Sequence, residues 1–372
     1  MEKVKIDDVL KYEQPTKYIV ETENYDDSYN TPVLTAGKSF LLGYTNEEKG
    51  VFNEVPVIIF DDFTTSFHFV DFPFKVKSSA LKILKAVKDK ADIKYLYYKM
   101  QTIKFEAEQH KRYWISKYSQ IEIPLPNLAT QQRIAAILDQ ADAIIQNNRA
   151  IVQKYDALTQ SLFLDMFGDP VKNEKGWEMK FLGDLCDVGS SRRVFVDELV
   201  ENGIPFYRGT EIGQMSIEDN ITPTLFITEE HYEKLKKETG VPKIGDLLMP
   251  SICPDGRIFE VTNDKPFYFK DGRVLWIKVN DGIINSVYLK KYLKAIFAID
   301  YGKIASGTTF AELKIFALKK INLHYPPIQL QNLFAERVAM IEAQKQQAQL
   351  ELAKSEELFN SLLQRAFKGE LS

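Results

Sequence analysis

The sequence has few cysteines and no long apolar run. Only two of its 372 residues are cysteine, Cys186 and Cys253, which is too few for a disulfide framework and does not match the spacing of a metal site. No stretch approaches the roughly 20 apolar residues that a membrane helix needs. The opening residues, MEKVKIDDVLKYEQ, lack the apolar core of a secretory leader. We therefore expect a cytoplasmic protein that contacts no membrane.

The sequence also lacks a complete catalytic constellation. Asp255 followed by Glu260 resembles the start of a nuclease motif, but the acidic-x-Lys that would complete it is missing, and Asp255-Gly256 is typical of a turn. No Asn/Asp-Pro-Pro-aromatic string, which adenine methylation needs to hold a flipped base, occurs. The four histidines are scattered without the spacing of metal ligands: His68, His110, His231 and His324. We expect a chain that is not an enzyme and binds no metal.

The net charge is small, but the charges are unevenly distributed. The net charge is −4 and the pI is about 5.8, which argues against a nucleic-acid-binding protein because attraction to phosphates is the usual source of its affinity. However, residues 2–71 carry a net −8, residues 75–117 a net +8 and residues 265–320 a net +7. The two basic segments indicate a pair of basic surfaces.

Two segments that lie 200 residues apart, 126–169 and 326–369, have related sequences. Their ungapped alignment matches these pairs: Pro126/Pro326, Gln131/Gln331, Ala135/Ala335, Ala143/Ala343, Gln146/Gln346, Lys154/Lys354, Leu158/Leu358, Ser161/Ser361, Leu162/Leu362 and Phe167/Phe367. Such an internal repeat indicates a duplicated unit. The chain is predicted to alternate a globular part, a long helix, a second globular part and a second long helix.

Each repeat has the apolar spacing of a coiled coil. In the first, the predicted seam recurs at steps of four and three residues: Ile134, Leu138, Ala141, Ile145, Asn148, Val152, Tyr155, Thr159, Leu162 and Met166. Asn148 and, in the second repeat, Lys345 interrupt the seam and would fix its register. Thr130 is the expected N-cap of the first helix, and Gly168 and Gly369 are expected to follow the two helix ends.

These patterns predict an α+β protein. Two heads of mixed strands and helices, residues 1–126 and 170–326, alternate with two long helices, residues 127–169 and 327–372. We expect the helices to pack antiparallel as a coiled coil, in a pseudo-twofold arrangement. The heads open on similar segments, 4–12 and 180–188, and close on similar strand-like segments, 121–126 and 321–326. Their interiors differ and the second head is longer, which indicates one fold with two specificities.

The chain resembles the specificity (S) subunit of a Type I restriction-modification system. The following strings, in this order, carry the resemblance, which covers nearly the whole chain: LTQSLF (158–163), GWEMKFLGD (176–184), IPFYRG (204–209), GDLL (245–248), SGTT (306–309), YPP (325–327) and LFNSLL (358–363). The first head departs from this pattern, with Ala107-Glu108-Gln109 at the places that correspond to Gly307-Thr308-Thr309. It is similar to another subtype of the same domain.

The resemblance implies a function in DNA recognition. Each head would be a target recognition domain that reads one half of a split sequence in double-stranded DNA. The helix pair would set the unread gap and dock two methyltransferase (M) subunits, and restriction/translocase (R) subunits would complete the complex. The chain itself would bind no cofactor, because S-adenosylmethionine, ATP and magnesium would be bound by the partner subunits.

Polar and basic side chains on loops are the candidates for DNA contacts, because they can reach base edges and phosphates. In the second head they are Arg192, Arg193, Arg208, Arg257, Arg273, Lys303, Ser306, Thr308 and Thr309. In the first head they are Lys38, Ser39, Thr64, Thr65, Lys104, Lys111 and Arg112. Arg208 and Arg257 are the preferred base readers, since an arginine can donate two hydrogen bonds to guanine.

Two other interpretations remain open from the sequence. A coiled-coil adaptor whose heads bind protein is favoured by the acidic pI and disfavoured by the paired basic segments. An enzyme such as a nuclease would need a constellation that the sequence does not complete. A methyltransferase gene beside this one would favour DNA recognition over both.

Overall fold

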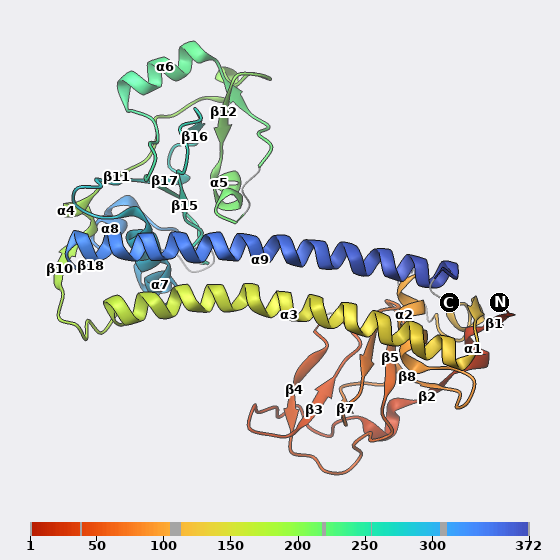
Figure 1. Cartoon of the computed structure of the whole chain (residues 1–372). Helices are drawn as coiled ribbons and strands as arrows, with labels where there is room; N and C mark the ends of the chain where they lie inside the picture. The colour runs from red at the N-terminus through yellow and green to blue at the C-terminus, as the bar shows by residue number, and fades with distance from the viewer. Residues whose placement is uncertain are drawn as a thin grey trace. The chain divides into compact units, whose positions relative to one another are not determined.

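The computed structural model of the chain (Figure 1) describes residues 2–37, 39–104, 113–217, 221–253, 255–305 and 311–370. Contacts divide the chain into two compact units. Unit 1 combines Met1–Ile151 with Ala348–Ser372, and unit 2 is Val152–Gln347. Each unit therefore contains one head, the first part of the long helix that follows this head, and the last part of the other long helix.

The two long helices are α3 (Leu128–Phe167) and α9 (Ile328–Lys368). Gly168 and Gly369 follow their ends with φ of 81° and 86°, as expected for the left-handed position after a helix. The expected cap at Thr130 is wrong. Asn127 Oδ1 accepts a hydrogen bond from the backbone N–H of Thr130 at 2.9 Å, so the helix begins three residues earlier, on the stronger capping residue.

Head 1 contains sheets of two, four and three strands. The two-stranded sheet pairs β1 (Glu2–Lys5) with β9 (Glu122–Leu125). The four-stranded sheet has the order β2 (Leu10–Glu13), β8 (Leu81–Ala86), β5 (Val57–Asp61) and β6 (Phe67–Val70). The three-stranded sheet has the order β4 (Leu41–Thr45), β3 (Thr31–Leu34) and β7 (Lys75–Val76). Its helices are α1 (Ile6–Val9) and α2 (Ile93–Gln101), with 3-10 turns η1 (Pro15–Tyr18) and η2 (Tyr118–Gln120).

Head 2 repeats this topology strand by strand. β10 (Glu178–Phe181) pairs with β18 (Asn322–Tyr325). The four-stranded order is β11 (Asp187–Gly189), β17 (Val274–Lys278), β14 (Leu247–Pro250) and β15 (Phe259–Glu260). The three-stranded order is β13 (Phe226–Ile227), β12 (Ile204–Tyr207) and β16 (Tyr268–Phe269). In both heads the middle strand of the three is antiparallel to one neighbour and parallel to the other. The expectation of one fold in both heads is confirmed.

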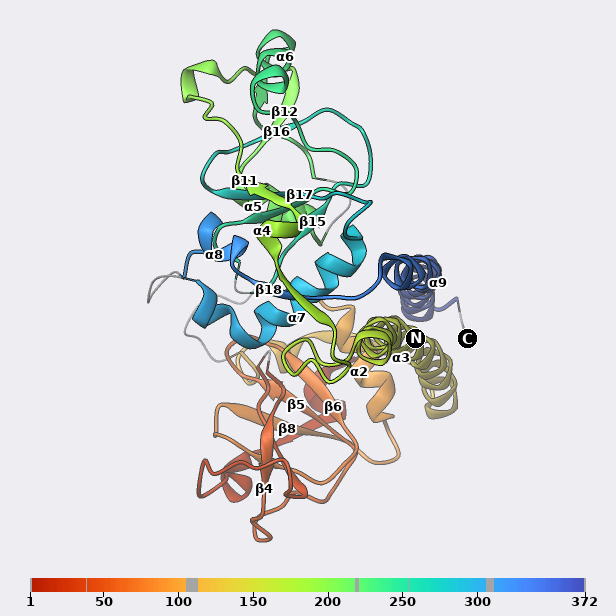
Figure 2. The same ribbon diagram turned by 90° about the vertical axis from the view of Figure 1, so that its left-hand side faces the viewer.

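The additional length of head 2 contributes two helices. Head 2 contains α4 (Leu182–Leu185), α7 (Ser286–Ile304) and α8 (Ile315–Lys319), the first two of which correspond in chain order to α1 and α2. It also contains η3 (Val196–Glu198), α5 (Gly209–Met215) and α6 (Glu229–Glu238). In the described part of head 1 the connections that correspond to α5 and α6 hold no helix. α5 packs against β14 and lies beside the four-stranded sheet (Figure 2).

A glutamine present in both repeats fastens each long helix to its head. Gln131 is fully buried; its Oε1 accepts from the backbone N–H of Asp92 at 2.9 Å, and its Nε2 donates to the backbone carbonyl oxygens of Lys90 and Pro126. Gln331 is equally buried, and its Oε1 accepts from Asn285 N–H at 2.9 Å while Nε2 donates to Pro326 O at 2.8 Å. Buried backbone groups must be paired, so this side chain defines where the helix leaves the head.

Aromatic residues repeat the same contact in both units. In unit 1 the rings of Tyr95 and Phe367 are 5.4 Å apart, and in unit 2 those of Tyr288 and Phe167 are 4.6 Å apart. Phe167 and Phe367 are a matched pair of the sequence repeat, and each tyrosine is the third residue of the equivalent helices α2 and α7. The repeat predicted from the helices therefore extends to their contacts with the heads within each unit.

The helices pack antiparallel within each unit, and polar pairs mark their register. In unit 1, Asn148 Nδ2 donates to Ser355 Oγ at 3.2 Å. In unit 2, Lys345 Nζ lies 2.5 Å from Asp156 Oδ1. Seam positions near the heads are buried, including Ile134 and Leu138 in unit 1 and Phe334 and Val338 in unit 2, whereas those beside the two polar pairs, such as Val152 and Leu352, are partly buried. The two polar interruptions of the predicted seam thus each find a partner on the other helix.

His324 gives the stability of unit 2 a predictable dependence on pH. The side chain is 1% exposed, and neither ring nitrogen has a hydrogen-bond partner among the described residues. Burial lowers the pKa of the imidazole, an effect that the charge of Asp169 partly offsets. As the pH falls below about 6.5 the unfolded histidine takes up a proton that the folded one does not, so stability decreases until the folded-state pKa is passed.

We expect the urea concentration at the midpoint of unfolding of unit 2 to decrease when the pH is lowered from 7.5 to 5.5. His324→Leu should remove part of that decrease. His231→Gln, which replaces another histidine of the same head, is the control and should leave the dependence intact. An equal pH dependence in His324→Leu and the unsubstituted protein would contradict this role of the buried imidazole.

Candidate nucleic-acid interface

Most of the predicted contact residues, though not Arg192, Arg193 and Arg273, fall on equivalent connections of the two heads. Lys38 and Ser39 follow β3, and Arg208 follows its counterpart β12. Thr64 and Thr65 follow β5, and Arg257 follows β14. Lys104, Lys111 and Arg112 follow α2, while Lys303 lies in the last turn of α7 and Ser306, Thr308 and Thr309 come after it. For the first two connections this correspondence was not visible in the sequence, because the interiors of the heads diverge. For the third, the sequence already places Ala107-Glu108-Gln109 opposite Gly307-Thr308-Thr309.

Six of these residues, Lys38, Lys111, Arg112, Ser306, Thr308 and Thr309, lie outside the described residues. After the last candidate in each head, Arg112 or Thr309, the chain returns to the residue that follows the central strand. In head 1, Tyr113 N–H donates to the Asp62 backbone oxygen at 3.0 Å; in head 2, Leu313 N–H donates to the Ser251 oxygen at 2.7 Å. Asp62 and Ser251 directly follow the central strands β5 and β14. The connection after α2 or α7 is thus anchored beside the connection after the central strand.

In head 2 three predicted arginines line one cavity. Arg208, Arg257 and Arg273 come from three different connections and border a cavity of about 470 Å³, together with Lys270. The remaining lining residues are Gly209, Thr210, Pro250, Ser251 and Ile252. Lys270 was missed as a candidate, although it lies in the basic segment 265–320. Four cationic side chains around one cavity of this size suit a strongly anionic ligand.

Glycines of α5 allow the arginines to approach this helix closely. A Cβ atom on Gly213 would lie 3.0 Å from Nη1 of Arg257, and one on Gly209 would lie 3.1 Å from the backbone oxygen of Arg273. Both distances are shorter than ordinary van der Waals contact. α5, which head 1 lacks at this connection, therefore forms one wall of the cavity and receives the Arg257 side chain.

Every predicted arginine of head 2 is paired with a carboxylate of the same head. The pairs are Arg192–Glu238 at 3.1 Å, Arg193–Asp271 at 3.1 Å, Arg208–Glu211 at 2.6 Å, Arg257–Asp255 at 2.8 Å and Arg273–Glu312 at 3.9 Å. Arg192 and Arg193 are not among the residues that line the cavity. This pairing reconciles a basic surface with an acidic protein, because the local charges largely cancel.

The described candidates of head 1 lie at its surface. Thr64 and Thr65 form the turn between β5 and β6, where Asp61 Oδ1 accepts from Phe63 N–H at 2.8 Å and Thr64 N–H at 3.0 Å. Thr65 has φ of 60°, a left-handed conformation that is uncommon for a β-branched residue. Ser39, Thr64 and Lys104 are exposed. The tip of this hairpin therefore presents two hydroxyl groups next to the segment that re-enters at Tyr113.

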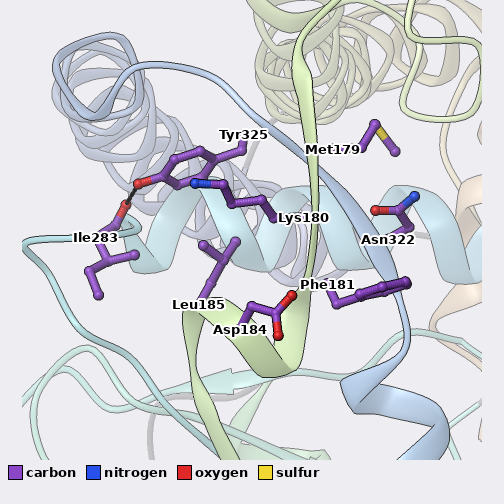
Figure 3. Close-up of a pocket in the computed structure, with 8 residues that line it drawn as sticks. All are labelled: Met179, Lys180, Phe181, Asp184, Leu185, Ile283, Asn322 and Tyr325. Carbon is purple, nitrogen blue, oxygen red and sulfur yellow. Dashed lines mark hydrogen bonds between the residues drawn. The ribbon is translucent and has the colours of Figure 1, made fainter.

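A larger cavity of about 640 Å³ lies beside β10 and β18 and contains none of the predicted contact residues (Figure 3). Lys180 Nζ lies 4.2 Å from the centre of the Tyr325 ring, whose hydroxyl donates to the Ile283 backbone oxygen at 3.1 Å. Met179 and Phe181 at its rim are exposed. With one ammonium group and one carboxylate, that of Asp184, this cavity lacks the cationic character of the cavity around Arg208.

Among the described residues no three His, Cys, Asp or Glu side chains come together as metal ligands. Cys186 and Cys253 are buried, and burial raises the pKa of each thiol to about 12, so both stay protonated at neutral pH. No helix in the described ranges is sufficiently long and apolar to cross a membrane.

Comparison of the sequence with protein families finds a match over most of the chain. The family described as "Type I restriction modification DNA specificity domain" matches residues 1–154 and 174–352. The specificity subunit of the Type I restriction enzyme EcoR124I/EcoR124II from Escherichia coli is 50% identical over 149 residues, which are 37% of this chain and 37% of that protein. A putative Type I specificity subunit from Haemophilus influenzae is 26% identical over 66% of this chain and 63% of its own length.

Other similarities extend over almost the full length. The specificity subunit of the Type I restriction enzyme MjaVIII from Methanocaldococcus jannaschii is 24% identical over 97% of this chain and 92% of that protein. The crystal structure of a Type I restriction-modification S subunit from M. genitalium superposes with a TM-score of 0.60 at 17% identity, covering 98% of this chain and 96% of that one. A chain from a structure of a Type I restriction-modification assembly gives 0.57 at 16% identity, covering 99% and 98%. At these identities the two structures establish a shared fold.

Proposed function

We propose that this chain, which belongs to the family of Type I restriction modification DNA specificity domains, recognises the DNA target of a Type I restriction-modification complex without catalysing a reaction itself. One observation carries the proposal. The two heads share their strand order, yet they present different side chains on equivalent connections. Base edges are distinguished by the side chains that reach them. Two heads with one scaffold but different side chains at these places therefore suit two different half-sites.

The long helices support a fixed gap between the half-sites. α3 is one helix of 40 residues, which corresponds to about 60 Å, and it contributes to both units. α9 begins in unit 2 and ends in unit 1, so it also contributes to both units. The pairs Asn148–Ser355 and Lys345–Asp156 hold the register within the units. Helices of fixed length and register suit a spacer that lets both heads bind only when the half-sites are the right distance apart.

An exposed apolar stripe on α3 supports docking of partner subunits. Ile144, Ile151 and Leu158 follow one another at intervals of seven residues and are 48%, 41% and 49% exposed. This is the spacing with which one helix packs along another in a coiled coil. We propose that methyltransferase subunits cover such stripes, and that these subunits and the restriction subunits carry S-adenosylmethionine, ATP and magnesium in the cytoplasm.

The substitution Arg208→Ala tests whether head 2 reads bases. In the complex with its methyltransferase subunits, we expect it to reduce discrimination at one position of the second half-site by about 1–3 kcal/mol. Folding should be preserved because the Arg208 side chain is 56% exposed. The measurement is competitive binding to duplexes with single base-pair changes.

Arg149→Ala is the matched control, because Arg149 is also a half-exposed arginine, paired with Glu356 on the long helices at 2.7 Å. It should leave base preference unchanged. Unaltered specificity in Arg208→Ala would remove Arg208 from the reading residues. A complex that prefers no DNA sequence would refute the proposed function.

A further inference from the structure

We propose that Glu211 is a positioning residue that holds Arg208 in the orientation for reading a guanine in the second half-site. The inference rests on the proposed function and names the base that this part of head 2 recognises. It also explains why an arginine at a candidate interface is already paired with a carboxylate. The pair orients the guanidinium instead of blocking it.

Glu211 is tied to Arg208 at two places. It lies in the first turn of α5, where Oε2 accepts from the Arg208 backbone N–H at 3.1 Å. Oε1 accepts from Nη2 of the Arg208 side chain at 2.6 Å and from Nε at 3.2 Å. The Glu211 side chain is 13% exposed and that of Arg208 is 56% exposed. A carboxylate anchored on the backbone therefore fixes an arginine whose outer part remains accessible.

The charge of Glu211 persists at neutral pH. Burial alone would raise the pKa of this carboxyl group, but the hydrogen bonds and charge of Arg208 hold it below its usual value. An ionised carboxylate makes stronger hydrogen bonds to a guanidinium than a neutral amide does. Replacing the carboxylate by an amide should therefore loosen the arginine without altering the shape of the helix start.

The geometry leaves one edge of the guanidinium free. An arginine has five N–H donors in a planar fork. Nε and Nη2 face Glu211, so the remaining edge consists of Nη1 and the outer N–H of Nη2. Two parallel donors match O6 and N7 of guanine, which are both acceptors, whereas adenine offers one acceptor and one donor in the major groove. Held in this way, Arg208 selects guanine.

The other cations of the cavity suit the phosphates around such a base. Lys270 and Arg273 border the same cavity as Arg208. Arg257 is held differently, since its Nε is bound by Asp255, which is 56% exposed, and its Nη1 faces Gly213 of α5. Arg208 is thus the arginine of this cavity whose free edge is best prepared for a base.

The test compares Glu211→Gln with the unsubstituted chain in the complex with its methyltransferase subunits. Binding is measured to duplexes in which each base pair of the second half-site is replaced in turn. We expect the preference for guanine at one position to fall by between about 5-fold and 150-fold. The other positions and the first half-site should be read as before.

Glu198→Gln is the matched control. Glu198 also accepts from the backbone N–H three residues earlier, that of Phe195 at 2.7 Å, at the start of η3, and it does not line the cavity. This variant should change no base preference. Arg208→Ala should lose preference at the same base pair as Glu211→Gln, and the two substitutions combined should lose no more than Arg208→Ala alone.

The outcomes separate this inference from the proposed function. If Arg208→Ala weakens the reading of one base pair but Glu211→Gln alters none, Glu211 does not position Arg208 and the proposed function stands. If the unsubstituted complex prefers no split sequence, both are wrong. Should Glu211→Gln fail to fold, Glu211→Asp takes its place, because a carboxylate one methylene shorter cannot keep its contacts with both the backbone and the guanidinium of Arg208. Unchanged guanine preference in that variant would overturn the inference.

Discussion

Replacing Gln331 by alanine is expected to lower the free energy of unfolding of unit 2 by about 2–6 kcal/mol. The side chain is fully buried and binds Asn285 N–H and Pro326 O, which both belong to the backbone. Alanine would leave these two groups without their partner, at a cost of about 1–3 kcal/mol each. Gln131→Ala should have a similar effect on unit 1, because Gln131 binds Asp92 N–H and the carbonyl oxygens of Lys90 and Pro126.

The chain provides a matched control for this result. Gln146 and Gln346 are another glutamine pair retained in both repeats, but they are exposed on the helices. The free energy of unfolding of their alanine variants should differ from that of the unsubstituted protein by no more than about 0.5 kcal/mol. Urea unfolding measures the effect, and hydrogen exchange at the Asn285 amide localises it. If Gln331→Ala were as stable as Gln346→Ala, the glutamine would not fasten the helix to the head.

Lengthening both long helices by one heptad is expected to change the gap in the DNA target and nothing else. The insertions belong between Ile151 and Val152 in α3 and between Gln347 and Ala348 in α9, where the two units meet in the chain. Seven residues add on the order of 10 Å, or roughly three base-pair steps, and keep the phase of the coiled-coil seam. The contacts within each unit should be preserved.

The readout is the map of methylated adenines produced by the chain together with its methyltransferase partner. We expect both half-sites to be retained and the unread gap to lengthen. A heptad inserted in α3 alone is the control, since α9 could not follow it and methylation should be lost. An unchanged gap after both insertions would show that the helices do not set the spacing.

The repeat made the long helices predictable because the same contacts constrain both copies. Gln131/Gln331 and Phe167/Phe367 match in the sequence. In its own unit each glutamine accepts a hydrogen bond from the backbone of the head, and each phenylalanine packs on a tyrosine of the head. Local preferences were less reliable at the helix start, because Thr130 and Asn127 are both capping residue types and the structure uses Asn127, the better cap. The apolar spacing predicts the seam between the helices, whereas the first residue of the helix depends on the residue type at the cap.

The strand-by-strand equivalence of the heads could not be predicted beyond their opening and closing segments. Strands such as β7 and β16 contain two residues each, and their parallel pairing with β3 and β12 depends on contacts distant in the sequence. Only a buried apolar side chain is required at most of these places, so the sequences of the two heads could diverge while the topology remained.

Residue type identified the arginines of the candidate interface but not their surroundings. That Arg208, Arg257 and Arg273 border one cavity follows from the way three connections meet. The carboxylate partners were not anticipated. For Glu211 a pattern was present, since a glutamate three residues after the cap position is typical of a helix start, and here the residue at the cap position is Arg208 itself.

The central claim is that the two heads read the two halves of a split DNA sequence. Its most direct test is to co-express the chain with its methyltransferase partner and to map methylated adenines across a genome. The account predicts one motif of two different halves separated by a constant unread gap. Methylation at a continuous motif, or at halves separated by variable distances, would contradict it.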